Sequence, residues 1–162
     1  MKGDNKMLSK PYHGWTTISV GNIILGPASY IQDVPIDCLD IFLSYFSPEN
    51  KLGFNFSFDA EGYSFGLIEF DSYLFSANEN PESGSLDLKE IRGSCFDEKT
   101  NDLAEGILVR LANELVDDIN NYMDEWVEWD LDYDMMSDDN KKKRKELLRS
   151  KVEALSSVLK KK

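Results

Sequence analysis

Polar and apolar residues alternate along the middle of the chain, which is the pattern of strands with one buried face. Three phenylalanines of the segment 54–58, for example, alternate with polar residues. An Asp-Ala-Glu-Gly turn at 59–62 and a polar segment at 78–85 with one proline and one glycine mark connections between strands. Since short connections favour antiparallel neighbours, the pattern predicts a meander. Its strands are expected at 54–58, 63–70, 72–77 and 86–91.

Ahead of the meander, the pattern predicts a strand, a turn and a helix. Residues 15–20 are β-branched and aromatic and run into Gly21-Asn22, after which 23–25 continue as a second short strand until Gly26-Pro27 interrupts it. Asp33 is a candidate helix cap, because a Pro follows in the first turn and apolar residues then recur at helical spacing as far as Phe46.

From Thr100 the apolar period changes to steps of three and four. This predicts a helix of roughly 25 to 30 residues, followed by a break at 130–139 and a last helix capped by Ser137 or Asp138. The last helix carries an apolar stripe of Leu148, Val152, Leu155 and Leu159.

These elements predict an α+β fold, with an antiparallel β-meander of about four to six strands packed against helices and a C-terminal helical hairpin. We expect a flexible N-terminus at 1–13, a single α+β domain at 14–130, and an acidic turn with a basic amphipathic helix at 131–162.

Composition narrows the class of protein. The 162 residues are 41% hydrophobic, enough for a real core, and carry a net charge of −12. Such a charge argues against direct nucleic-acid binding, because phosphates repel an anionic surface. The N-terminus has no apolar leader, and no apolar run approaches the length of a spanning helix, so we expect a cytoplasmic protein without a membrane partner.

Charge is strongly segregated along the chain. Residues 1–110 carry 17 acids and 8 bases, residues 111–139 carry 11 acids and no Lys or Arg, and residues 140–162 carry 2 acids and 10 bases. The acidic helix is destabilised by like charges at i, i+4 and by carboxylates near its C-terminus. The basic helix is destabilised by the cations at its N-terminus.

Three interpretations of this segregation stay open. The acidic and basic segments neutralise each other in a helical hairpin, or part of the acidic face stays exposed for a cationic partner. The basic helix could instead lie on an anionic membrane or recruit another helix. If the acidic face binds a partner, the candidate residues are Asp117, Asp118, Asp124, Glu125, Glu128, Asp130, Asp132, Asp134 and Tyr133. Trp126 and Trp129 lie among these acids and are assigned to the core in preference to the interface.

The residues that carry chemistry form no catalytic or metal-binding motif. The segment 130–134 resembles the opening of a calcium loop, but Met135 and Lys141 occupy the positions that need Gly and Glu. His13 is the one histidine, and Cys38 and Cys95 have no metal-ligand spacing. We therefore expect no cofactor, no metal and no enzymatic activity. An enzyme would need a carboxylate pair in a cleft, for which the candidates are Asp59, Glu61, Glu69 and Asp71.

Three stretches at 14–21, 26–30 and 54–62 give the first 95 or so residues a resemblance to a known class of proteins. The order of strand, helix, β-meander and long acidic helix resembles the small acidic immunity proteins of bacterial toxin–immunity pairs, such as those of contact-dependent growth inhibition and polymorphic toxin systems. The resemblance implies an inhibitor that binds a cognate toxin, and it carries over no functional residue.

The first functional hypothesis is therefore an immunity protein that neutralises a basic protein toxin, a nuclease in preference to other activities, through its acidic surface. A DNA mimic directed against restriction enzymes or other nucleases is an alternative, which predicts several targets. An adaptor that binds through its basic C-terminal helix is another. The sequence predicts no oligomeric state.

Overall fold

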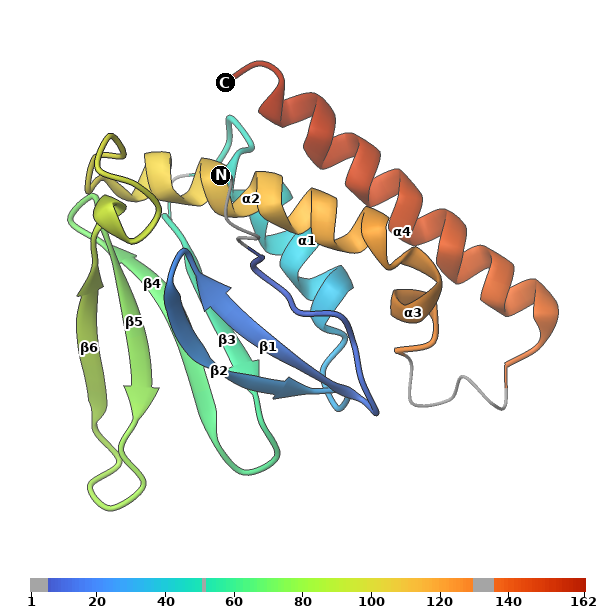
Figure 1. Ribbon diagram of the computed structural model, residues 1–162, viewed down its shortest axis with the longest axis horizontal. Coiled ribbons are helices and arrows are strands. Elements are labelled where there is room, and N and C mark those ends of the chain that lie inside the picture. Colours follow the sequence, from blue (N-terminus) through green and yellow to red (C-terminus); the bar gives the residue numbers. More distant parts are fainter. Residues whose placement is uncertain (1–5, 51, 130–135) are drawn as a thin grey trace.

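A four-stranded antiparallel sheet forms the larger β part of the protein in the computed structural model, which describes residues 6–50, 52–129 and 136–162 (Figure 1). Its strands lie side by side in chain order, so the predicted meander is confirmed. Connections of four, two and six residues join the successive strands, as antiparallel neighbours allow. The strands are β3 (Asn55–Asp59), β4 (Ser64–Phe70), β5 (Tyr73–Glu79) and β6 (Leu86–Ile91).

The first two strands, β1 (Trp15–Val20) and β2 (Ile23–Ser29), form a separate antiparallel sheet. The turn between them requires Gly21, which has φ +58° and lies so close to the Cys95 carbonyl that a Cβ atom would collide with it. Strand β2 continues through Gly26-Pro27, where a break was predicted, because a register shift opposite β1 accommodates the irregularity.

The N-terminal segment lies along β1, which differs from the predicted flexible N-terminus at 1–13. The Met7 carbonyl accepts from the Ser19 N–H, and Leu8 pairs with Ile18. Both Met7 and Leu8 are fully buried, so the described part of this segment, from residue 6, belongs to the domain.

Within the described residues, four α-helices and a short 3-10 helix complete the fold. These are α1 (Val34–Tyr45), η1 (Gly93–Cys95), α2 (Ala104–Asn121), α3 (Met123–Val127) and α4 (Asp138–Leu159). The predicted helix of 25 to 30 residues is divided in two at Tyr122, whose backbone (φ −129°, ψ 38°) is not helical. Ser137 caps α4 by accepting from the Asn140 N–H, as predicted.

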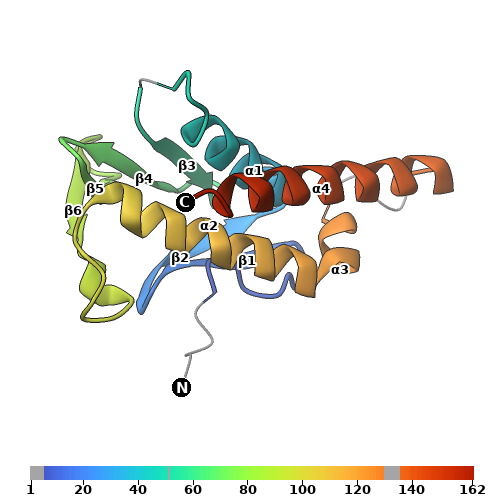
Figure 2. The ribbon, with the colours of Figure 1, turned by 90° about the horizontal axis from the view of Figure 1, so that it is seen from above.

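Helix α4 lies across both α1 and α2 and also touches α3, whereas the strands pack on the other side of α1 and α2 (Figures 1 and 2). The predicted apolar stripe of α4 faces this contact, since Leu148 and Leu155 are fully buried and Val152 and Leu159 nearly so. One continuous core therefore joins the C-terminal helix to the rest of the domain.

Candidate partner-binding surfaces

The predicted acidic site is divided between surface and interior. Asp117, Asp124 and Glu128 are exposed, Glu125 is half-buried, and Asp118 is buried. Asp130, Asp132, Tyr133 and Asp134 lie outside the described residues. The acids that the structure leaves at the surface gather around the end of α2 and along α3.

Asp118 holds the N-terminal segment in place and does not face solvent, which corrects its assignment to a partner-facing surface. Its Oδ2 accepts from the Leu8 N–H at 2.9 Å, and the side chain is 3% exposed. Burial raises the pKa of Asp118 to about 6, against the opposing effect of the backbone N–H groups of Leu8 and Met7 and the charge of Lys6. The carboxylate supplies the acceptor that a buried backbone donor needs.

Glu114 lies one helical turn before Asp118, and both of its carboxyl oxygens are buried without a hydrogen-bond partner among the described residues. Burial raises the pKa of Glu114 to about 7, the charge of Asp118 adds to this shift, and Arg110 opposes it. The buried side of α2 therefore carries two carboxyl groups with raised pKa values. The sequence pattern does not reveal their burial, because carboxylates on a helix are usually exposed.

The two tryptophans of the acidic segment belong to the core, as assigned from the sequence. Trp126 is fully buried and donates its indole N–H to the Asp118 carbonyl at 3.3 Å. Trp129 is 3% exposed and donates to the Gln32 carbonyl at 2.8 Å. Their rings lie 5.3 Å apart. Neither ring is available as an anchor for a partner.

Arg144 fixes the start of α4 to the end of α3. Its guanidinium is 7% exposed, donates to the carbonyls of Trp126 and Val127, and forms a two-fold hydrogen-bonded ion pair with Asp33 at 2.8 and 3.1 Å. These carbonyls are at the end of α3, where the regular helical hydrogen bonds stop, and that of Trp126 also accepts from the Trp129 N–H at 3.3 Å. Asp33 stands at the N-cap of α1, as predicted, but its side chain makes no capping bond and is paired with Arg144.

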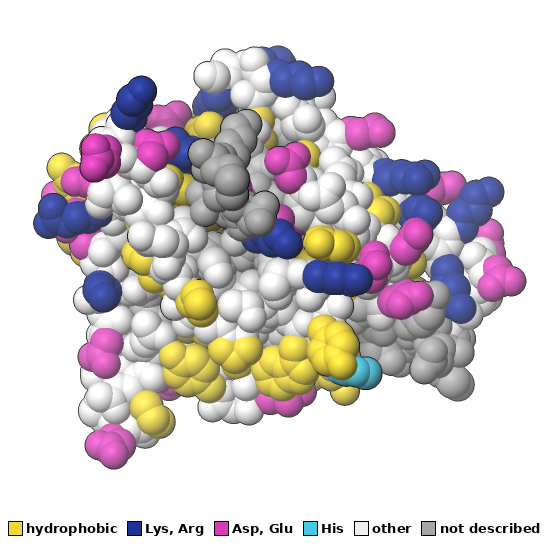
Figure 3. Space-filling model, in the orientation of Figure 1, with side chains coloured by type: hydrophobic (Ala, Val, Ile, Leu, Met, Phe, Trp, Pro, Cys, Tyr) yellow, Lys and Arg dark blue, Asp and Glu magenta, His cyan; other side chains and the backbone are white. Residues whose placement is uncertain are grey.

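Other cations of α4 and of the C-terminal residues after it pair with acids on three different helices. Lys151 pairs with Asp40 of α1, Lys162 with Glu105 at the start of α2, and Lys145 with Asp124 of α3. Acidic and basic side chains are accordingly interleaved in Figure 3 at the end of the molecule where α4 begins. The cations of residues 140–162 therefore pair with acids on several elements and not with the preceding acidic segment alone.

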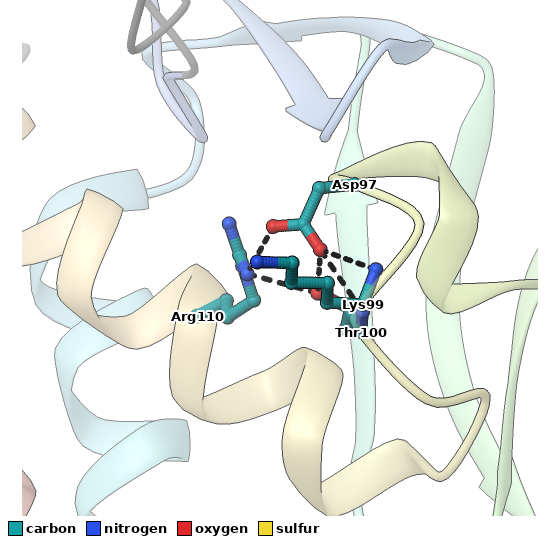
Figure 4. Close-up of polar contacts among 4 residues, drawn as sticks. All are labelled: Asp97, Lys99, Thr100 and Arg110. Atoms are coloured by element: carbon teal, nitrogen blue, oxygen red, sulfur yellow. Dashed lines mark hydrogen bonds and ion pairs between the residues drawn. The ribbon is translucent and has the colours of Figure 1, made fainter.

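A polar cluster around Asp97 fixes the loop that leads into α2 (Figure 4). Asp97 accepts from Lys99 N, from Thr100 N and Oγ1, and from Arg110 Nη1, the last at 2.7 Å. The Thr100 hydroxyl and these other donors hold the pKa of Asp97 below its ordinary value. Arg110 also lies over the Phe96 ring. Because its members bond to one another, we interpret this cluster as structural.

The outer face of the four-stranded sheet is largely apolar and exposed. This surface was not among those predicted from the sequence. Cross-strand pairs on this face are Ile68–Phe75, Phe70–Tyr73 and Ala77–Leu88. Phe70 is 69% exposed and Leu88 55%. An antiparallel sheet usually carries polar residues on its solvent side. A signal was present in β4, where apolar residues occur in both alternating sets.

A second exposed apolar region lies near β1 and β2. Tyr12 and Ile24 are each 73% exposed, and Tyr12 pairs with Trp15. Figure 3 shows a band of hydrophobic side chains across the lower part of this face, in the region of β2. Exposed apolar patches of this kind are typical of interaction surfaces.

The carboxylates considered for an enzyme are not brought together. Asp59 and Glu61 lie at the β3–β4 turn, at one end of β4, whereas Glu69 and Asp71 lie at the other end, where Glu69 accepts from the Phe54 N–H. Within the described residues there is no group of three or more His, Cys, Asp or Glu residues placed to bind a metal ion. In the same part of the chain, no helix combines the length and the apolar character needed to cross a membrane. Cys38 and Cys95 are buried and unpaired.

Comparison of this chain with protein-family models, with curated proteins and with solved structures found no match.

Proposed function

We propose that this protein is an immunity protein that binds and neutralises a basic protein toxin, a nuclease in preference to other activities, through the acidic surface around the end of α2 and α3. The net charge of −12 and the absence of any Lys or Arg between residues 111 and 139 support an anionic binding surface. Asp117, Asp124 and Glu128 are the described, exposed members of that surface.

The observation that carries the proposal is which acids pair with the cations of residues 140–162. Arg144, Lys151 and Lys162 pair with Asp33, Asp40 and Glu105, which lie outside the acidic segment 111–139. Lys143 and Lys145 pair with Asp139 and Asp124, which lie inside it. Three of these five ion pairs therefore use acids of other segments, and the basic residues neutralise the acidic segment only in part. A partner with its own cations could bind the exposed acids of this surface.

The physical argument for a nuclease follows from charge. An enzyme that cleaves nucleic acid binds phosphates in a basic cleft. An inhibitor that presents carboxylates can cover such a cleft, and long-range attraction speeds its association. Exposed charges act over about 8 Å at physiological salt, so this attraction weakens as salt is added.

The proposal is tested by capturing partners from cells that naturally make the protein and then expressing the captured partner alone and together with it. We expect one stoichiometric basic partner that is toxic alone and harmless when coexpressed. A triple variant, Asp117→Lys, Asp124→Lys and Glu128→Lys, is expected to lower affinity at least about tenfold and to flatten its salt dependence.

A matched control changes the charge by the same amount elsewhere, through Glu49→Lys, Glu61→Lys and Glu82→Lys, all of which are exposed. We expect this control to bind its partner more nearly like the wild type. If both triple variants bind and protect equally, the surface around α3 is not the interface. Several partners released together by modest salt would instead indicate a DNA mimic or an adaptor, and the absence of any partner would refute the immunity function.

A further inference from the structure

The backbone groups at the two edges of the four-stranded sheet have different partners. At the β3 edge, the Gln32 side chain donates to the Ser57 carbonyl and accepts from the Asp59 N–H, both at 2.9 Å, as a neighbouring strand would. The β6 edge lies at the outer side of the molecule (Figures 1 and 2), and within residues 6–50, 52–129 and 136–162 the only strand that pairs with it is β5. An edge of this kind is a template for pairing with another chain.

The hydrogen-bond pattern shows which groups of β6 point outward. Asn80 N donates to the Ser85 carbonyl at 2.8 Å, at the end of the β5–β6 ladder. Since hydrogen-bonded and non-hydrogen-bonded pairs alternate in an antiparallel ladder, Asp87 and Lys89 bond to β5. The backbone N–H and C=O groups of Leu86, Leu88 and Glu90 therefore point away from the sheet.

The sequence of β6, Leu-Asp-Leu-Lys-Glu-Ile, is complementary to itself about Leu88. In an antiparallel two-fold pair centred there, Leu88 lies opposite its own copy, and each Asp87 lies opposite the Lys89 of the other chain. Neither Asp87 nor Lys89 forms an ion pair within the described residues, and both are exposed. Centring on Asp87 or Lys89 would place like charges opposite each other, which is unfavourable.

We propose that β6 pairs antiparallel with β6 of a second copy of this chain, centred on Leu88, to form a two-fold symmetric dimer with a continuous eight-stranded sheet. Charge complementarity favours a second copy as the partner of this edge, because the pairing forms two contacts between Asp87 of one copy and Lys89 of the other. It also places Leu88, which is 55% exposed, against its copy and extends the apolar outer face across the symmetry axis. This inference is independent of the proposed toxin binding.

The dimer is expected to be weak, because one pair of short strands forms a small interface and each copy carries a net charge of −12. Salt at about 0.15 M screens repulsion beyond roughly 8 Å and leaves the close contacts of β6 effective. We therefore expect dimers at protein concentrations on the order of 100 µM and monomers at about 1 µM.

Sedimentation velocity across this concentration range tests the proposal. The single variants Asp87→Lys and Lys89→Asp each set like charges opposite one another, and each is expected to raise the dimer dissociation constant at least about tenfold. A mixture of the two single variants should form a heterodimer, because each lysine then faces an aspartate. The double variant with both changes should dimerise like the wild type.

Glu49→Lys serves as a control for the change in net charge, since Glu49 is exposed in the loop after α1. It should dimerise at least as well as the wild type. A wild-type protein that remains monomeric at several hundred micromolar overturns the proposal. So does a dimer that the single variants leave intact, since such a dimer would use another surface, such as the apolar outer face.

Discussion

Asp117 and Asp118 are adjacent in the sequence and identical in chemistry, but the structure uses them in opposite ways. Asp117 is exposed, whereas Asp118 is 3% exposed and accepts from the backbone of Leu8. Arg144 and Lys145 repeat this contrast in α4, where the first is buried against α3 and Asp33 and the second is a partly exposed partner of Asp124. The number of charges in a segment therefore does not give the charge of its surface.

The largest effect should come from the buried cation. Arg144→Met removes the donors to two carbonyls and leaves Asp33 without its partner, so we expect a loss of about 3 kcal/mol in the free energy of unfolding. Lys145→Met removes an exposed ion pair and should cost about 0.5 kcal/mol or less. Urea unfolding measures both. Equal losses would show that the α3–α4 contact does not depend on the guanidinium.

Variants of the two aspartates should differ less in their free energy of unfolding. Asp118→Ala leaves the buried Leu8 N–H without an acceptor and should destabilise the fold by about 1 to 2 kcal/mol. Asp117→Ala should change the free energy of unfolding by no more than about 0.5 kcal/mol. Amide hydrogen exchange at Leu8 provides a second measurement, and protection that survives Asp118→Ala would contradict the assigned bond.

Glu114 should make stability fall as pH rises. Its folded pKa of about 7 is above the ordinary 4.5, so the folded state binds the proton more tightly than the unfolded state. Its contribution to stability is full below about pH 4.5 and is lost as pH rises through about 7. Asp118, whose pKa is raised to about 6, acts in the same direction.

Glu114→Gln keeps the shape of the side chain and removes this ionisation. We expect it to raise the free energy of unfolding by about 1 kcal/mol near pH 8, after discounting for partial solvent screening, and to change little near pH 4.5. Urea unfolding at both pH values measures the difference. If the variant keeps the full pH slope of the wild type, Glu114 ionises freely in the folded state.

Local patterns predicted most of the secondary structure. The alternation at 54–58 and the short turns placed the meander correctly, because β3, β4 and β5 each have one face in the core. Ser137 and the leucine stripe of α4 were equally local signals. The interruption at Tyr122 was missed, since the apolar steps of three and four continue from α2 into α3 and contain no Gly or Pro to mark a break.

The arrangement of the candidate site could be predicted less well from local sequence patterns. Asp118 lies on the face of α2 that the N-terminal segment covers, and that segment was expected to be flexible. Its burial depends on a contact between residues 110 positions apart. The apolar outer face of β4 to β6 could have been expected from β4, which has apolar residues on both faces, whereas its lack of cover could not.

The sequence by itself determined the strands of the meander, the cap at Ser137, the apolar stripes and the division of charge, because these depend on the periodicity and chemistry of neighbouring residues. Tertiary structure alone decided which acids are exposed, where the cations of α4 bind, and which edge of the sheet remains open. Burial and charge pairing depend on segments far apart in the chain, such as Asp33 with Arg144, and their distances are set only when the helices and sheets have packed.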